Sequence, residues 1–179
     1  MALSVRNIIN QINKSLEGIF KGSSLYGIST LIEREGKSQP VVDSKPVSYD
    51  DSYSMQAYHK LQGAVISYRP GYGNKRTTIN TFQVSLVVFN NEQITKIKTD
   101  EIAMIIQSVL SALNITSVQI LPTAIILNSQ QIFSTEYKGV PYTLNEYQSL
   151  MQINYQVEIT FQGSCFDLCP EDFVGCATN

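Results

Sequence analysis

The sequence predicts an α+β fold: a mixed, mostly antiparallel sheet with two amphipathic helices packed on one face. Apolar residues recur at helical spacing in two segments, 5–20 and 99–113. In the segment 151–161 apolar and polar residues alternate strictly, which is typical of a strand with one face on the core. The chain has 179 residues, 43% of them hydrophobic, which suffices for one core. We therefore expect a single domain over residues 1–162.

The first helix is expected over residues 5–20. Ser4 is a plausible N-cap because its hydroxyl can accept a hydrogen bond from a free backbone N–H. Gly22 is a natural end for this helix. Its apolar residues form one face and its polar residues the other, so the helix must cover part of the sheet.

A strand is expected over 25–33, followed by a long loop or arm over 36–58. This second segment contains two prolines and shows little apolar periodicity. Tyr49, Tyr53 and Tyr58 lie in it, and tyrosine offers a large amphipathic contact area. We expect these tyrosines to contact a partner subunit. A short strand around residues 41–42 and an ordinary surface loop remain alternatives.

A long hairpin is expected over 62–89, with its tip at 69–77. The tip is dense in turn-forming residues and carries Arg69, Tyr72, Lys75 and Arg76. Cations can meet phosphates and aromatic rings can stack on bases, so the tip suits a small nucleic-acid contact. A protein contact or a solvated tip is the alternative, and we include these four residues in the expected interface.

The second helix is expected over 99–113. Thr99 can cap it, and the acidic residues that follow suit the positive end of the helix dipole. Asn114 can end it in the left-handed conformation. Strands are expected over 117–127 and over 131–137, and Pro122 makes the first of them irregular or places it at an edge.

After the last strand, residues 163–179 are expected to form an irregular C-terminal arm. Phe166 and Phe173 are its candidate partner contacts. The three cysteines, Cys165, Cys169 and Cys176, all lie in this arm. Four ligands are usual for a zinc site, so we expect no metal here and interpret the cysteines as small apolar side chains.

The sequence lacks the motifs of common catalytic sites. His59 is its single histidine, and it carries no GxSxG elbow, Walker loop or GxGxxG motif. Nucleophilic catalysis usually pairs serine or cysteine with a general base, most often histidine. We therefore expect no enzyme activity and no cofactor.

The formal net charge is -2, so no overall basic field attracts nucleic acid or an acidic membrane. No apolar run approaches the roughly 20 residues that span a bilayer. The first residues are amphipathic and do not resemble a secretory signal. We expect the chain to mature in a reducing cytoplasm, without membrane contact.

Three blocks carry a family resemblance: TFQVSLVVFNN (81–91), KTDEIAMIIQSVLSALN (98–114) and QINYQVEITFQ (152–162). Their order resembles the tail terminator and tail completion (neck) proteins of tailed bacteriophages. In that family a strand and a short polar turn lead into a helix on the sheet, and a closing strand follows. The resemblance covers most of residues 3–162, and the segments 36–58 and 163–179 depart from compact members.

The resemblance implies a structural virion protein without catalysis, assembled in the host bacterial cytoplasm. It would form a homo-oligomeric ring around the DNA channel, at the head–tail connector or the tail terminus. Portal, connector or tail proteins would be its neighbours, with non-specific DNA contact in the channel. Two alternatives stay open: a small-molecule or peptide binding module walled by the sheet and helix 99–113, and a hydrolase using Cys165 or Cys169.

Overall fold

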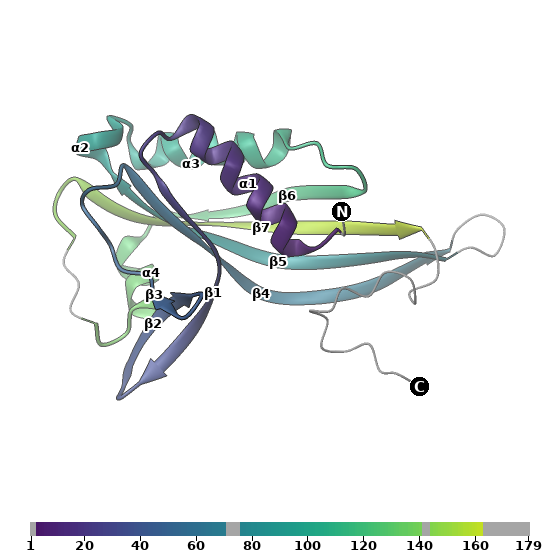
Figure 1. Ribbon diagram of the computed structural model, residues 1–179, viewed down its shortest axis with the longest axis horizontal. Coiled ribbons are helices and arrows are strands. Elements are labelled where there is room, and N and C mark those ends of the chain that lie inside the picture. The colour runs from purple at the N-terminus through teal and green to yellow at the C-terminus, as the bar shows by residue number, and fades with distance from the viewer. Residues whose placement is uncertain (1–2, 71–75, 141–143, 163–179) are drawn as a thin grey trace.

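The computed structural model describes residues 3–70, 76–140 and 144–162, which form one mixed sheet with helices on both faces (Figure 1). Seven strands lie in the order β3-β2-β1-β4-β5-β7-β6. All neighbouring strands are antiparallel except β1 and β4, which are parallel. The predicted α+β class is confirmed. The elements in chain order are α1 (Val5–Ile19), β1 (Ser24–Arg34), β2 (Lys37–Val42), β3 (Lys45–Pro46), β4 (Met55–Pro70), β5 (Arg76–Asn91), α2 (Glu92–Thr95), α3 (Thr99–Ala112), β6 (Val118–Ile126), α4 (Ser129–Glu136) and β7 (Gln148–Gln162).

The main core lies between the sheet and two helices, α1 and α3, which cover the same face (Figure 1). Alternate residues of β5 and β7 point into it, as the period of two in their sequences predicts. The predicted packing of both amphipathic helices on one face is therefore confirmed. The buried members from the helices are Ile8, Ile9, Ile12, Leu16, Ile102, Ala103, Ile106 and Leu110.

A second, smaller core lies on the opposite face, at one end of the sheet. There α4 and the β2–β3 hairpin cover Val87 and Phe89 of β5 (Figure 1). Tyr58 of β4 and Tyr137 after α4 are buried in it. The sheet is thus covered on both faces at this end, whereas the β4–β5 hairpin extends away at the other end.

The prediction of a strand over 131–137 is wrong: residues 131–136 lie in the helix α4, and Tyr137 is its C-cap. The Asn128 side chain accepts a hydrogen bond from the Gln131 N–H at 3.1 Å and so caps the helix. Its buried residue Ile132 and the following Tyr137 face the second core. A helix of 8 residues shows barely two turns of periodicity, so its pattern is easily taken for a strand.

The segment 36–58 is also not the loop or arm that was predicted. It holds β2, β3 and the start of β4, so of the two alternatives the short strand around 41–42 is the one present. Asp43 and Ser44 both have positive φ, 49° and 65°, as a two-residue hairpin turn of the primed type requires. Pro40 and Pro46 are tolerated because this hairpin lies at the border of the sheet.

Candidate interaction surface

The three tyrosines predicted to contact a partner do not share one surface. Tyr58 is fully buried in β4, within the second core, because its side chain points to that face of the sheet. Tyr49 is half-buried and packs on Phe89, with ring centroids 5.5 Å apart. Tyr53 alone is exposed, in the turn before β4. Their predicted placement on one arm is wrong.

Of the predicted basic tip, Arg69 is exposed near the end of β4. Tyr72 and Lys75 lie outside the described residues. Arg76 is the first residue of β5, opposite Pro70, and its side chain is not described. Phe166 and Phe173 also lie outside the described residues.

The hairpin carries a surface that the sequence did not single out, which we call the β4 apolar edge. It is defined by Leu61, Val65, Ile66 and Tyr68, four large apolar side chains within the projecting half of β4. All described side chains from Leu61 to Arg69 are exposed, and among the large apolar side chains of the described residues only Met104, at 67%, is more exposed than Val65 and Tyr68, at 60% and 61%. Scattered apolar residues are ordinary on a surface, but a run on one strand marks a contact site.

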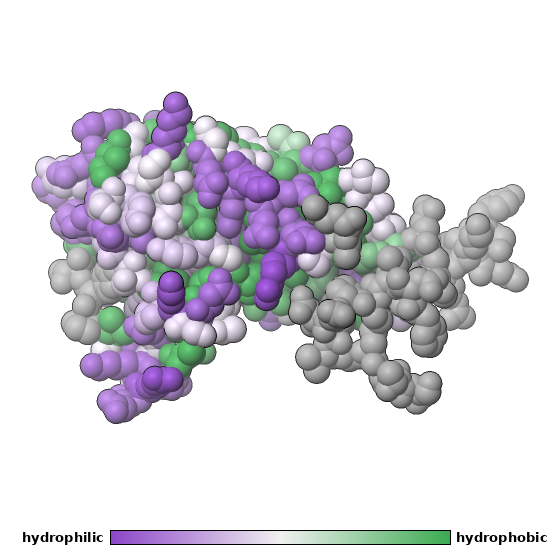
Figure 2. Space-filling view, viewed as in Figure 1, coloured by the Kyte–Doolittle hydropathy of each residue, from purple (hydrophilic) through white to green (hydrophobic). Residues whose placement is uncertain are grey.

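The register of the hairpin places most of this surface on one face. Ile66 lies opposite Asn80 and Tyr68 opposite Thr78, on the face that α1 and α3 cover elsewhere. Leu61 lies opposite Val84 of the main core, and a bulge between Leu61 and Gly63 shifts the register before this face resumes. Three of the four side chains therefore extend the helix-covered face beyond the helices. In Figure 2 apolar surface is visible below the hydrophilic side chains of α1, along the middle of the molecule.

The same half of β4 is an open sheet edge. β1 runs parallel to β4 only from Ser24 to Ser29, opposite Gln56 to Lys60, and then leaves to pair with β2. Beyond Lys60 no strand of the described chain pairs with this side of β4. Outward N–H and C=O groups on such an edge are a template for a further strand.

The opposite edge of the sheet is protected in a way that the β4 edge is not. β6 carries Pro122 and a register shift between Pro122 and Ala124. Proline removes a backbone donor and so discourages pairing; a bulge also bends a strand, and β4 has one as well, between Leu61 and Gly63. The exposed part of β4 from Leu61 to Arg69 contains neither proline nor an acidic residue, and Arg69 is its single charge. Between β6 and this unpaired half of β4, β4 is the strand better suited to accept a partner.

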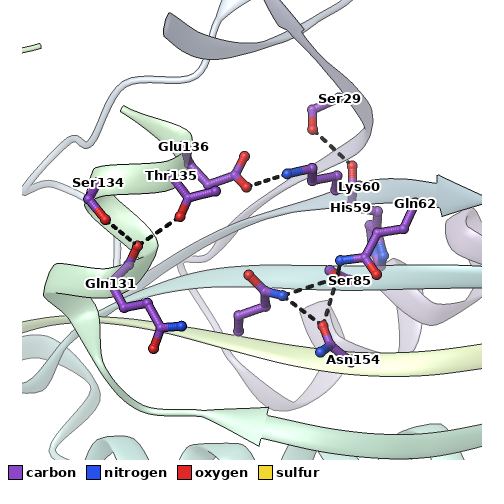
Figure 3. Close-up of polar contacts among 11 residues, drawn as sticks. Ser29, His59, Lys60, Gln62, Ser85, Gln131, Ser134, Thr135, Glu136 and Asn154 are labelled. Atoms are coloured by element: carbon purple, nitrogen blue, oxygen red, sulfur yellow. Dashed lines mark hydrogen bonds and ion pairs between the residues drawn. The ribbon is translucent and has the colours of Figure 1, made fainter. Parts of the chain in front are cut away.

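Polar side chains fix the start of this edge (Figure 3). Lys60 forms an ion pair with Glu136 of α4, a nearly fully buried carboxylate. Gln62, the next polar residue, donates to Ser85 at 2.6 Å, and Ser85 donates to Asn154 at 2.7 Å. These contacts join β4 to α4, β5 and β7 on the face opposite the main helices. They hold residues 60–62, where the projecting half of β4 begins, in place.

His59 lies inside the main core, fully buried on the face of β4 that the helices cover. Its Nε2 lies 2.8 Å from the Asn13 Oδ1 and its Nδ1 lies 2.7 Å from the Tyr155 hydroxyl. The Asn13 amide also donates to the Tyr26 carbonyl at 2.9 Å, so its oxygen accepts from His59. Tyr155 then donates to Nδ1, and the ring is neutral. Burial lowers the pKa of His59 to about 3.

Among the described residues, no three histidine, cysteine or acidic side chains gather as metal ligands would, and the cysteines lie outside that part of the chain. No helix of the described chain is long and apolar enough to cross a membrane. A scan against protein-family models finds no match, and a search of curated proteins finds no significant match. The projecting β4 edge, with its open backbone and exposed apolar side chains, is the candidate functional site.

Proposed function

We propose that this protein is a structural subunit that assembles with copies of itself into a ring, at the neck or tail terminus of a tailed-phage virion. The observation that carries the proposal is the β4 apolar edge, an open strand with four exposed apolar side chains on a hairpin anchored by two cores. The family resemblance of the three sequence blocks supports the virion location. Portal, connector or tail proteins would adjoin the ring.

Energetics favour a contact at this edge. Full burial of a large apolar side chain stabilises by about 1.5–3 kcal/mol, and these four are half exposed, so each offers roughly half of that. Pairing of the open edge replaces backbone hydrogen bonds to water by hydrogen bonds between strands, each with a net gain of about 0.5–1.5 kcal/mol. A contact of the β4 edge with a different surface of the next copy is heterologous, and such contacts build a ring when the rotation between copies closes.

Mass photometry and negative-stain electron microscopy of the purified full chain test the proposal. We expect closed rings of one defined size, whose population grows with concentration. A protein that stays monomeric at tens of micromolar (about a thousandfold above the range of tight assemblies) would exclude a self-assembling ring. Met104→Lys is the matched control for lysine substitutions in the β4 apolar edge such as Ile66→Lys. Met104 is exposed on α3, away from the hairpin, so its substitution should leave assembly unchanged.

Non-specific DNA contact is the second part of this proposal. Arg69 is exposed at the projecting end of the hairpin, and many copies in a ring would gather many such charges. We expect duplex DNA to bind the ring more tightly than the monomer, with affinity that falls steeply as salt rises. Arg69→Ala should weaken that binding without changing ring size.

The same edge also favours one alternative, a peptide-binding module. An extended peptide can add a strand to an open edge, with its backbone giving affinity and its side chains giving specificity. The two functions differ in whether the purified chain associates with itself. A monomeric chain that takes up extended peptides at β4 would favour the module.

A further inference from the structure

We infer that the C-terminal segment 163–179 of a neighbouring copy seats on the β4 apolar edge and joins copies head to tail. The inference rests on the proposed assembly and names the partner surface within it. Three properties of the chain carry it: the charges of the two regions, their apolar side chains, and the point at which the segment leaves the sheet.

The charges of the two regions are opposite. From Leu61 to Asn91 the chain has three cations, Arg69, Lys75 and Arg76, and no acidic residue. The segment 163–179 has three acidic residues, Asp167, Glu171 and Asp172, and no lysine or arginine. Opposite charges across an interface steer encounter and fix orientation. Like charges would keep two β4 edges apart at their basic ends, which disfavours β4 pairing with itself in parallel.

The segment also supplies apolar side chains in the number that the edge needs. Phe166, Leu168, Phe173 and Val174 are four large apolar residues in a stretch of 17, against four on the edge. Aromatic anchors flanked by polar residues are typical of the centres of protein interfaces. The edge therefore meets a segment that matches it in both charge and apolar content.

The segment begins at the right place. Gln162, the last residue of β7, pairs with Thr77, which also pairs with Arg69 of β4. The chain thus leaves the sheet at the projecting end of the hairpin, one residue after Phe161, which packs against the main core (Figure 1). At about 3.3 Å per residue the segment can span roughly 55 Å when extended, whereas the nine residues from Leu61 to Arg69 span roughly 30 Å. It is long enough to reach and cover the edge of an adjacent copy.

Donor and acceptor are different surfaces in this contact. Each copy gives its segment to the next copy and receives one on its own β4 edge. Such a heterologous contact repeats until rotation closes the ring. The inference therefore links the open edge, the C-terminal segment and the ring in one arrangement.

Two full-length variants test it. The edge variant carries Val65→Lys and Ile66→Lys, and the segment variant carries Phe166→Asp and Phe173→Asp. We expect each variant to self-associate at least about tenfold more weakly than the native chain, because each lacks one half of every contact. An equimolar mixture should form dimers and stop there, since one good segment meets one good edge. Circular-dichroism melting confirms that both variants are folded.

The outcomes separate the two proposals. A native chain that never self-associates overturns the proposed function. Native rings that persist in both variants overturn the C-terminal docking and leave the ring intact. Variants that are monomeric alone and stay monomeric when mixed overturn docking between copies. Weakening of the mixed dimer when salt rises from about 0.05 to 0.5 M supports the charge pairing, because salt screens exposed charges, and an unchanged dimer contradicts it.

Discussion

His59 is fully buried in β4, and its ring nitrogens are bound by Asn13 and Tyr155. The bonds suit the neutral ring, and burial lowers its pKa from 6.5 to about 3. Between pH 6.5 and about pH 3 the imidazole of His59 is therefore protonated in the unfolded chain but neutral in the folded chain. The unfolding free energy falls as the pH falls through this range. Between pH 7.5 and pH 5 we expect His59 to cost about 2 kcal/mol of unfolding free energy.

Urea unfolding of His59→Gln at both pH values isolates this contribution from that of the carboxylates. The variant is expected to be less stable than the native chain at pH 7.5, because Tyr155 loses its acceptor in the core. When the pH is lowered from 7.5 to 5, the unfolding free energy of the variant should fall by about 2 kcal/mol less than that of the native chain. Equal losses in the two proteins would show that His59 takes up its proton in the folded state.

At the scale of elements, the two main helices begin differently. Ser4 caps α1, accepting from the Asn7 N–H at 3.2 Å. The predicted cap of α3, Thr99, is instead the first helical residue, and its hydroxyl contacts Glu92 and Ser149. Lys98 holds the cap position of α3 without a side-chain bond, and Asn114 is not left-handed. The helix itself was predicted from its periodicity, while the cap depends on neighbours that local sequence does not reveal.

Because α1 has a side-chain cap and α3 has none, substitutions at their two cap positions should change the unfolding free energy in opposite directions. Ser4→Ala removes a cap and is expected to lower the unfolding free energy by about 1 kcal/mol. Lys98→Ser adds a hydroxyl at an exposed position with extended backbone, φ -70° and ψ 153°, and should raise it by about 0.5–1 kcal/mol. Chemical denaturation of both variants measures these changes. A destabilising Lys98→Ser would mean that the α3 start cannot accept a cap.

The long elements could be predicted, and so could β6 at the edge of the sheet, whereas the short elements β3 and α4 could not. The strand 151–161 and the hairpin 62–89 lie inside β7 and β4–β5, because alternation over many residues identifies a half-buried strand. Within 36–58 a short strand around 41–42 was only an alternative to an arm, because prolines in a strand are tolerated only at a border, which is a property of the whole sheet. The β4 apolar edge was missed for a related reason: nothing near Leu61 records that β1 leaves after Ser29.

At the scale of the whole molecule, the buried core is distinct from the exposed β4 apolar edge that we propose as the contact site. Ile106 and Ile66 show the division with the same side chain: Ile106 is 0% exposed between α3 and the sheet, and Ile66 is 44% exposed on the hairpin. Truncation of a buried isoleucine leaves a cavity that close-packed neighbours fill only in part. Substitution of an exposed isoleucine removes little from the folded monomer. The two positions should therefore affect different measurements.

Ile106→Ala is expected to cost about 2–5 kcal/mol of unfolding free energy while leaving rings intact below its melting temperature, because no interface atom changes. Ile66→Lys should change monomer stability by no more than about 0.5 kcal/mol yet weaken ring formation, because it places a charge in the β4 contact. Denaturation measured at low concentration and mass photometry at high concentration separate the two effects. Should Ile66→Lys destabilise the monomer as much as Ile106→Ala does, the edge belongs to the fold and is not reserved for a partner.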